Sequence, residues 1–204
     1  MPACEWYSLL VENNIPTPKS ILIGVSLSDL ESTIAKYIDE YPFVRLCNAS
    51  PKDICCIFND APEIAASRAV AALKDSARTW WMLDNKIIHL FMREIVHIGV
   101  ECRCFYYRGN IRAVSVGEHV EMKDDFEELV REFFSTVGNF RQLGFDQFTL
   151  DISVDVETVD VFVVELNGFR GNTSAELFDW ECDDALLRGE LGEIEFRYPR
   201  EFSW

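Results

Sequence analysis

Positively charged residues are scarce in this sequence. Its 204 residues include 19 lysines and arginines against 35 aspartates and glutamates, which gives a formal net charge of −16. A chain with this excess of negative charge repels nucleic acids and anionic membrane surfaces. We therefore expect neither nucleic acid nor a membrane among its partners. A basic protein surface or a ligand chelated by a cation fits the charge better.

Long apolar runs and paired metal-binding cysteines are missing as well. No run approaches the roughly 20 apolar residues that span a bilayer, and the acidic stretch MPACEWYSLLVENN has no basic region ahead of an apolar core. The seven cysteines include no C-x-x-C pair, and the three histidines show no metal-ligand spacing. We expect a soluble, non-secreted, cytoplasmic protein with reduced thiols.

The patterns that are present predict an α+β fold. Helices alternate with antiparallel strand pairs, and the length suits one domain of ordinary size or two tightly joined lobes. A capping-box pattern at Ser28 and Glu31 predicts the start of the second helix. The predicted helices cover 3–12, 28–38, 62–81 and 123–143. The predicted strands cover 20–26, 43–47, 54–58, 86–98, 99–108, 111–117, 145–155 and 160–167.

The last predicted hairpin combines an apolar face with a polar one. A turn over 156–160, centred on Thr158, places Asp151 directly opposite Glu165. Alternate side chains of a strand point to opposite faces. The even positions form the apolar core face, with Phe148, Leu150, Ile152, Val154, Phe162, Val164 and Leu166. The odd positions form the polar face, with Thr149, Asp151, Ser153, Asp155, Glu165 and Asn167.

Two opposed carboxylates on that polar face predict a cation site. Directly opposed side chains have Cβ atoms about 4.5–5.5 Å apart, where like charges destabilise the pair. Mg²⁺ would reverse the repulsion, because it prefers oxygen ligands and usually takes one or two protein carboxylates. Asp151, Glu165 and Asn167 are therefore the candidate metal ligands. The alternative is a solvated face on which the acids point apart into water.

Several segments together resemble known nucleotide-binding proteins. REIVHIGVECRCF (93–105) and FVVELN (162–167) resemble the ATP-grasp superfamily through Glu94, Gly99, Glu101 and the pair Glu165 and Asn167. Blocks along most of the chain are similar to the cell division cycle protein 123 family, an ATP-grasp-like group. These blocks are WYSLL, PTPKSILI, PFVRLCNASPKDICCIF, MREIVHIGVECRCFYYRGNIRAVS, FTLDISVD with VFVVELNGF, and ELFDWE.

This resemblance implies two small lobes with antiparallel sheets and flanking helices. An N-terminal lobe over 1–92 would supply basic phosphate contacts, and a C-terminal ATP-grasp lobe over 93–204 would hold the metal. Mg²⁺ is implied at Asp151, Glu165 and Asn167. The residues that the resemblance assigns to ATP are Arg45, Lys52, Arg93, Glu94, Ile95, Val96, Glu101 and Arg103, with adenine at the backbone of 94–96.

The sequence departs from the family pattern at several positions. Arg45 replaces a lysine, Glu165 replaces an aspartate, and Gly168 replaces a proline. VSVGEH (114–119) stands where the family has Ser-Gln-Arg-Asp, and Ser174 stands where it has a second aspartate. These changes would weaken nucleotide binding or redirect the substrate.

The resemblance implies an ATP-loaded assembly chaperone for a protein partner, the gamma subunit of translation initiation factor two. The alternative is an ATP-grasp ligase that activates a carboxylate as an acylphosphate. A third possibility is a relative that binds a partner without nucleotide. Beyond Arg170 and Arg188, no basic cluster after residue 167 would hold an acceptor carboxylate. This favours binding over ligation.

Overall fold

Two separate sheets organise the chain, which we describe from a computed structural model covering residues 2–118, 120–121 and 123–199. The chain forms two compact units. The smaller comprises residues 2–7 and 18–96, and the larger comprises residues 8–17 and 97–204. The boundary at residue 96 lies four residues beyond the predicted lobe boundary. Helix α1 (Ala3–Glu12) contributes residues to both units.

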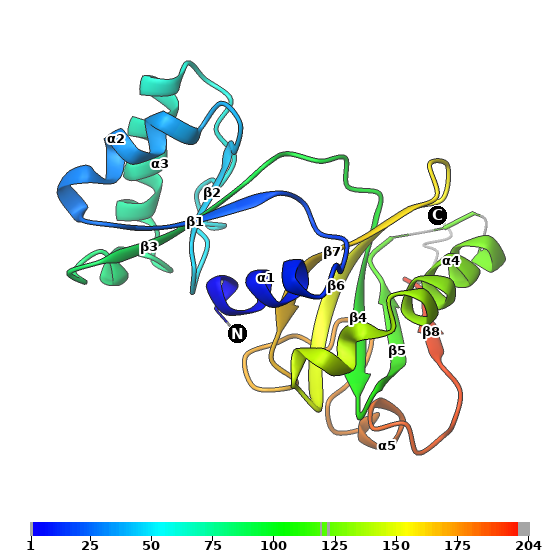
Figure 1. The fold of residues 1–204 in the computed structure, drawn as a ribbon. Helices are drawn as coiled ribbons and strands as arrows, with labels where there is room; N and C mark the ends of the chain where they lie inside the picture. Colours follow the sequence, from blue (N-terminus) through cyan, green and yellow to red (C-terminus); the bar gives the residue numbers. More distant parts are fainter. Residues whose placement is uncertain (1, 119, 122, 200–204) are drawn as a thin grey trace, which may run out of the picture. The chain divides into compact units, whose positions relative to one another are not determined.

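A three-stranded antiparallel sheet forms the centre of the smaller unit (Figure 1). Its strand order is β1 (Ser20–Val25), β3 (Ile88–Arg93) and β2 (Phe43–Leu46). Helices α2 (Leu30–Tyr37) and α3 (Pro62–Asp75) accompany it, with short 3₁₀ turns at η1 (Leu27–Asp29) and η2 (Trp80–Met82).

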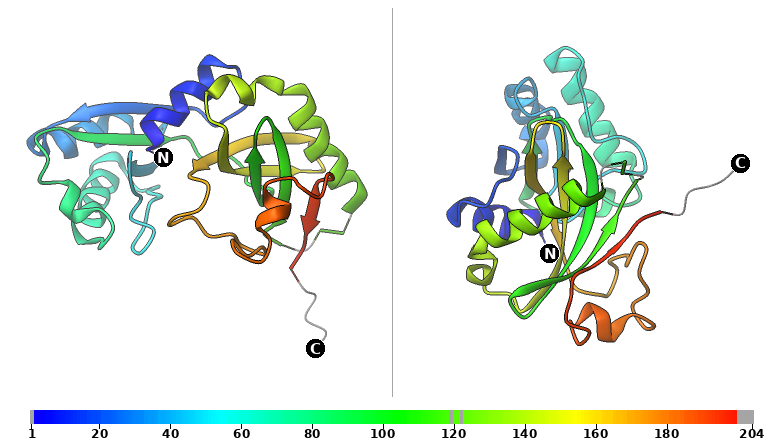
Figure 2. Two further views of the ribbon diagram at one scale, coloured as in Figure 1. Left: turned by 90° about the horizontal axis from the view of Figure 1, so that it is seen from below. Right: turned by 90° about the vertical axis from the view of Figure 1, so that its right-hand side faces the viewer.

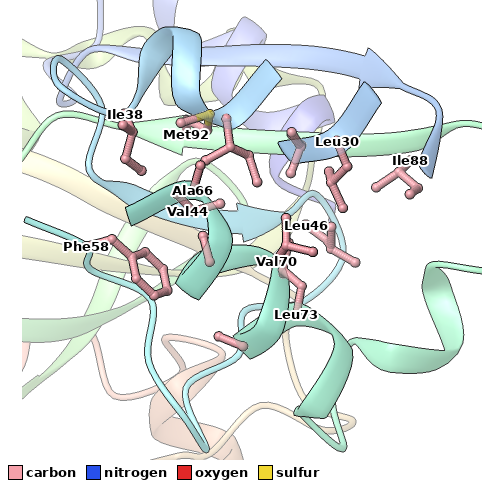
Figure 3. Packing of buried hydrophobic residues seen from close by; sticks show 14 of the residues in the cluster. Leu30, Ile38, Val44, Leu46, Phe58, Ala66, Val70, Leu73, Ile88 and Met92 are labelled. Carbon is pink, nitrogen blue, oxygen red and sulfur yellow. The ribbon is translucent and has the colours of Figure 1, made fainter. Parts of the chain in front are cut away.

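The core of the smaller unit is almost purely aliphatic. Leu30, Val44, Val70 and Met92 meet between the helices and the sheet (Figure 3). Helix α3 suits this position because Pro62 occupies its first turn and small alanines let it approach its neighbours closely. Fully burying such a side chain contributes about 1.5–3 kcal/mol. Hydrophobic burial is therefore what stabilises this unit.

Three local predictions in the smaller unit were wrong. The stretch 54–58 is not a strand, since only Ile57 forms an isolated bridge, with Phe43. The capping box does not form, because Asp29 occupies the N-cap position of α2 without a side-chain capping bond and instead accepts a hydrogen bond from the Ser26 hydroxyl (2.6 Å). Strand β3 covers less than half of 86–98, because residues 94–99 are irregular.

A five-stranded sheet forms the centre of the larger unit. Its order is β7 (Asp160–Asn167), β6 (Gln147–Asp155), β4 (Val100–Tyr107), β5 (Asn110–Val116) and β8 (Glu195–Arg197). All pairs are antiparallel except β5 with β8, so the sheet is mixed. The predicted α+β class is confirmed. The sequence patterns did not reveal β8 or the short helix α5 (Asp184–Leu187).

Both faces of this sheet are covered. Helix α4 (Lys123–Thr136) and the 3₁₀ turn η3 (Gly138–Leu143) replace the single predicted helix 123–143 and cover one face, where Phe140 packs on Tyr106 and Phe148. The segment 168–190, which includes α5, covers the other face through Phe178 and Leu187. The left view of Figure 2 shows the strands between α4 and this orange segment.

In the β6–β7 hairpin, a bulge offsets the register shift that a shorter turn introduces. Asp155 pairs with Asp160, so the turn is one residue shorter than predicted. A β-bulge at Val164 then inserts one extra residue in β7 and restores the predicted pairing of Asp151 with Glu165. Between the bulge and the turn, the predicted faces are wrong. Val163 is the fully buried residue of this stretch, while Phe162 and Val164 are only half-buried.

No helix in the described ranges is long and apolar enough to cross a membrane.

Candidate functional site

The β6 part of the hairpin's polar face is buried. Thr149 is 0 % exposed, Ser153 1 % and Asp151 5 %, although all three are polar. Asp151 lies opposite Glu165, and Thr149 lies opposite Asn167. Polar groups are removed from water at a cost unless they find partners. The solvated-face alternative is therefore wrong for Asp151.

Arg103 of β4 supplies the partner of the buried carboxylate. Strands β4 and β6 pair so that Arg103 stands opposite Asp151. Its Nε donates to Asp151 Oδ1 and its Nη2 to Oδ2, both at 2.8 Å. Asn167 Nδ2 donates to the same Oδ2 at 3.1 Å. A two-pronged arrangement fixes the guanidinium and the carboxylate in one plane.

Gly99 sets the position of β4 against β6. A Cβ on this residue would lie 2.3 Å from the carbonyl oxygen of Val154, so only glycine permits this approach of the two backbones. The Gly99 amide donates to the Ser153 hydroxyl at 2.9 Å. The glycine and glutamate of the ATP-grasp-like pattern therefore stand at the start of the strand that presents Arg103.

A loop of the covering segment closes over Arg103. Its Nη1 donates to the carbonyl of Ser174 at 3.1 Å and to Glu176 Oε1 at 2.8 Å. Glu176 has φ 54°, in the left-handed region that non-glycine residues rarely adopt. The loop is anchored below by Leu177, whose amide donates to the Ser115 hydroxyl at 3.2 Å. Such local strain is typical of binding sites.

The charges of this cluster favour the ionised guanidinium. Burial by itself would lower the pKa of Arg103, but the hydrogen bond with Asp151 and the charges of Asp151, Glu176 and Glu165 raise it above its ordinary value. Three carboxylates thus surround one guanidinium. The cluster has an excess of negative charge that a further cation would balance.

A cavity of about 340 Å³ adjoins this cluster. Its polar lining comes from Glu101, Arg103, Ser115, Asp151 and Glu176. On the same strand face as Asp151, the Thr149 hydroxyl is buried with no hydrogen-bond partner among the described residues. Arg103, Asp151 and Glu176 therefore face a space that a small ligand group could enter.

The donor set fits magnesium and does not suit a transition metal. In the part of the chain that the structure describes, no three histidine, cysteine, aspartate or glutamate side chains are placed to hold a metal ion together. The polar face of the β6–β7 hairpin instead offers two carboxylates, Asp151 and Glu165, beside the amide of Asn167. Mg²⁺ commonly takes one or two carboxylates and completes its shell with water and phosphate oxygens.

In the smaller unit, Arg45 and Lys52 lie around Cys56. Burial raises the pKa of the Cys56 thiol, and the charges of Lys52 and Arg45 act against that rise. Arg45 is 8 % exposed and its Nε donates to the Leu46 carbonyl at 3.2 Å. Lys52 is exposed. Two of the predicted phosphate contacts are therefore neighbours.

Arg93 is the last residue of β3, and Glu94 to Val96 follow it. The Arg93 guanidinium lies 5.1 Å from the ring centre of Phe91 and 5.7 Å from that of Trp6, a favourable cation–π arrangement. Glu94 and Lys19 exchange two hydrogen bonds, from the Lys19 amide to Glu94 Oε1 (2.7 Å) and from the Glu94 amide to the Lys19 carbonyl (3.0 Å). Beyond them, Ile95 is exposed.

Sequence reasoning missed two members of the larger unit's cluster. Glu176 and Ser115 reach Arg103 and the covering loop from segments whose apposition depends on the fold. The departures from the family pattern at 114–119 and Ser174 were the available signal, because both stretches border this cavity; His119 lies outside the described residues. Arg170 and Arg188 both pair with Asp184, so they are engaged inside the covering segment.

No protein-family model matches the sequence, and the search of curated proteins found no match. Solved structures do match. A C-terminally truncated Cdc123 from Schizosaccharomyces pombe has a TM-score of 0.73 at 16% identity, and the match covers 98% of this chain and 95% of that one. A second structure of Cdc123 from the same organism has a TM-score of 0.66 at 19% identity, with the same coverage.

ATP-grasp enzymes match more distantly. The D-alanine–D-alanine ligase of Bacillus anthracis, solved with ATP, has a TM-score of 0.57 at 16% identity, covering 93% of this chain and 62% of the ligase. This chain therefore spans less than two thirds of that enzyme but nearly all of the Cdc123 structures. The resemblance seen in the sequence is confirmed at the level of architecture: the chain has the ATP-grasp-like fold of Cdc123.

Proposed function

We propose that this protein binds Mg²⁺-ATP and uses the loaded form to bind and assemble a protein partner. The observation that carries the proposal is the cluster of the buried Asp151 with the half-buried Arg103 and Asn167 beside a cavity. A sheet face with no binding role would be filled by apolar side chains, as the opposite face is. The ATP-bound ligase with the same fold supports a nucleotide as the ligand.

In this proposal Asp151, Glu165 and Asn167 hold the metal. These three side chains would supply oxygen ligands to Mg²⁺, and the bound ion would offset the negative charge of the phosphates. Arg103 already has its guanidinium desolvated and oriented by Asp151. It is thereby preorganised to donate to a phosphate without a large loss of side-chain freedom.

The remaining proposed contacts are those that the family resemblance assigns to individual residues. Arg45, Lys52 and Arg93 provide positive charge for phosphate oxygens, and the backbone over 94–96 meets adenine. Glu101, which lines the cavity at Arg103, joins the nucleotide contacts. A triphosphate carries several negative charges, so cationic side chains are needed in addition to the metal.

The proposed partner is the gamma subunit of translation initiation factor two. This follows from the resemblance to the cell division cycle protein 123 family, and the net charge of −16 suits a partner with a basic face. The covering segment 168–190 already docks on the sheet through Arg103 and Ser115, so a ligand bound beneath it would hold its outer side as a defined surface for the partner.

Titration calorimetry tests the nucleotide. We expect saturable heat with ATP and Mg²⁺, and little heat with ATP in the presence of a chelator. Asp151→Asn should weaken binding at least about tenfold, since changes in or around a metal shell commonly cost 10–100-fold. Asp160→Asn, an exposed aspartate at the far end of β7, removes the same charge and should bind as the wild type does.

Absence of heat with millimolar Mg²⁺-ATP would overturn the nucleotide assignment. Equal weakening by Asp151→Asn and Asp160→Asn would show that net charge governs binding, and not the proposed metal ligands Asp151, Glu165 and Asn167.

A pull-down with the gamma subunit tests the partner. We expect capture by the wild type in Mg²⁺-ATP, and reduced capture by Asp151→Asn. If capture is the same with and without nucleotide, partner binding does not depend on the nucleotide site, and that part of the proposal is wrong. Release of ADP that requires a small carboxylate acceptor would instead support the ligase alternative.

A further inference from the structure

A second cavity of the larger unit lies away from the candidate nucleotide site. Its volume is about 470 Å³. It is bounded by the β4–β5 turn, the last turns of α4, the η3 turn, and residues that precede β8. It shares no lining residue with the cavity beside Asp151. Any ligand there is independent of the proposed nucleotide.

Arginines give this cavity a positive lining. Arg112, Arg131 and Arg141 come from β5, α4 and η3, so three separate elements each contribute an arginine to the lining. The described residues that line the cavity include no aspartate or glutamate. Glu127 pairs with Arg131 at 3.4 Å from one helical turn away. Local charge of this sign is unexpected in a chain with a net charge of −16.

Two polar groups of the lining residues also lack direct partners. The Tyr106 side chain is only 3 % exposed, and its hydroxyl makes no direct hydrogen bond among the residues described. Burial raises the pKa of Tyr106, and the nearby Arg141 acts against that rise. The Nε of Arg112 is also buried without a partner, but it packs against Gly189 outside the lining. Buried polar groups are normally satisfied, so the Tyr106 hydroxyl is the group at this cavity that a ligand would complete.

Aromatic rings complete the lining. Phe134 and Phe140 lie with ring centres 5.3 Å apart, and Ile111 and Ile194 add aliphatic surface. A site that combines apolar walls with a few converging polar groups is typical of small-molecule pockets of about 300–1,000 Å³.

We propose that this cavity binds a small organic anion that joins an aromatic or similarly flat apolar group to a phosphate or carboxylate. The guanidiniums of Arg112, Arg131 and Arg141 donate to the anionic group. The Tyr106 hydroxyl donates a further hydrogen bond, and the two phenylalanine rings contact the apolar part. Neither inorganic phosphate nor a neutral aromatic compound satisfies both halves of this lining.

Phenyl phosphate and benzoate are suitable probes, with inorganic phosphate and phenol as the half-ligands. Calorimetry of the wild-type chain should show phenyl phosphate or benzoate binding at least about tenfold more tightly than either half-ligand, since each good charge-assisted bond is worth about tenfold. The stronger of the two probes identifies the anionic group. Mg²⁺-ATP present in excess should leave this binding unchanged.

Substitutions in the cavity lining test whether the probe binds at this cavity. Arg141→Gln should weaken the preferred probe about tenfold, and Ser135→Glu, which places a negative charge in the lining without removing an arginine, should abolish binding. Arg78→Gln, an exposed arginine of the smaller unit, is the matched control and should bind normally. Thermal unfolding of each variant verifies that the fold is retained.

Several outcomes would overturn the proposal. They are the absence of binding by both probes to the wild type, equal affinity for phenyl phosphate and inorganic phosphate, competition by Mg²⁺-ATP, or equal weakening by Arg78→Gln and Arg141→Gln.

Discussion

The two faces of the five-stranded sheet are both buried, yet they are built from different chemistry. On the face covered by α4, Cys102, Cys104 and Leu150 are almost fully inaccessible, and burial raises the pKa of both thiols. On the face covered by 168–190, Arg103 and Asp151 occupy the intervening positions of the same two strands. Alternation along β4 and β6 therefore separates a packed core from a polar cluster.

This difference indicates that the polar face, which contributes less to stability, is the one available for binding. Apolar packing on one side contributes stability without directional requirements. A buried ion pair contributes little net stability compared with well-packed apolar residues, because desolvation offsets its attraction. Retaining Arg103 and Asp151 at buried positions is therefore better explained by a ligand than by stability.

The largest effect is expected from the apolar face. Phe148 is 0 % exposed and stacks on Tyr106 with ring centres 4.4 Å apart. Phe148→Ala should lower the free energy of unfolding by about 3–5 kcal/mol, because a large cavity is left in the core. Urea denaturation measures this change. A loss below about 1 kcal/mol would show that α4 and η3 do not form a close-packed layer on this face.

A smaller effect is expected from the polar face. Asp151→Asn should lower the free energy of unfolding by about 2 kcal/mol, the range for bonds to charged groups. The loss stays below the 3–5 kcal/mol of an isolated buried pair, because Arg103 keeps its bond to Glu176. Glu165→Gln, on the opposed residue, should be neutral or stabilising, since it relieves carboxylate repulsion.

Urea denaturation of the two variants separates the contribution of the Arg103–Asp151 bonds from that of the repulsion between Asp151 and Glu165. If Asp151→Asn is stabilising, the cluster is strained in the absence of ligand. If Glu165→Gln costs as much as Asp151→Asn, Glu165 has a structural role that differs from the one proposed.

The sequence was sufficient to predict the hairpin and its opposed acids. Alternation of apolar and polar residues carries that information, because a register error of one residue would turn every polar side chain of the strand toward the apolar core. The agreement at Asp151 nevertheless depended on two cancelling deviations, a shorter turn and the bulge at Val164. Neither leaves a clear signal in the sequence. The core positions of β7 between them were consequently mispredicted.

The covering segment could not be predicted, because its position depends on long-range contacts. Phe178 and Trp180 pack edge-on against Phe105 with ring centres 5.3 and 5.4 Å away. Their two-residue spacing is that of a strand face, but this stretch forms turns and no strand. Glu176 reaches Arg103 only through that docking. The stretch 54–58 lies beside β2 but makes only the isolated bridge of Ile57 with Phe43, so its strand-forming residues do not extend into a continuous ladder.

A third prediction concerns the attachment of the covering segment. Arg197 of β8 donates to both Asp183 carboxylate oxygens at 2.7 Å, and this bond, ahead of other causes, lowers the pKa of Asp183 below its ordinary 3.8. A depressed pKa contributes stability above pH 3.8 that is lost as the pH falls through the folded-state pKa. The pair is partly exposed, so its contribution should be under about 1 kcal/mol.

Comparison of Arg197→Gln with the wild type tests this attachment. The variant should be less stable at pH 7 by up to about 1 kcal/mol, and the difference should shrink in unfolding experiments below pH 3.8, where Asp183 becomes protonated. Arg108→Gln serves as a control outside this ion pair. A difference that is the same at pH 3 and pH 7 would mean that Arg197 acts through its contact with Phe178 instead (4.2 Å to the ring centre).

The smallest effect is expected at the hairpin turn, which belongs to neither face. Val159 is 63 % exposed with φ 61°, a conformation that costs a β-branched residue about 1–2 kcal/mol. Val159→Gly removes that strain but adds freedom to the unfolded chain, worth roughly 0.5–1 kcal/mol. The variant should therefore gain up to about 1 kcal/mol by urea denaturation, while binding of Mg²⁺-ATP stays unchanged.

Thr158→Gly is the matched control, because Thr158 does not have a positive φ and its amide donates to Asp155 Oδ1 at 3.2 Å. It should be neutral or destabilising. If Val159→Gly also weakened nucleotide binding, the turn would be coupled to Asp151 through the strand register, and the bulge at Val164 would not isolate the polar face from changes at the turn.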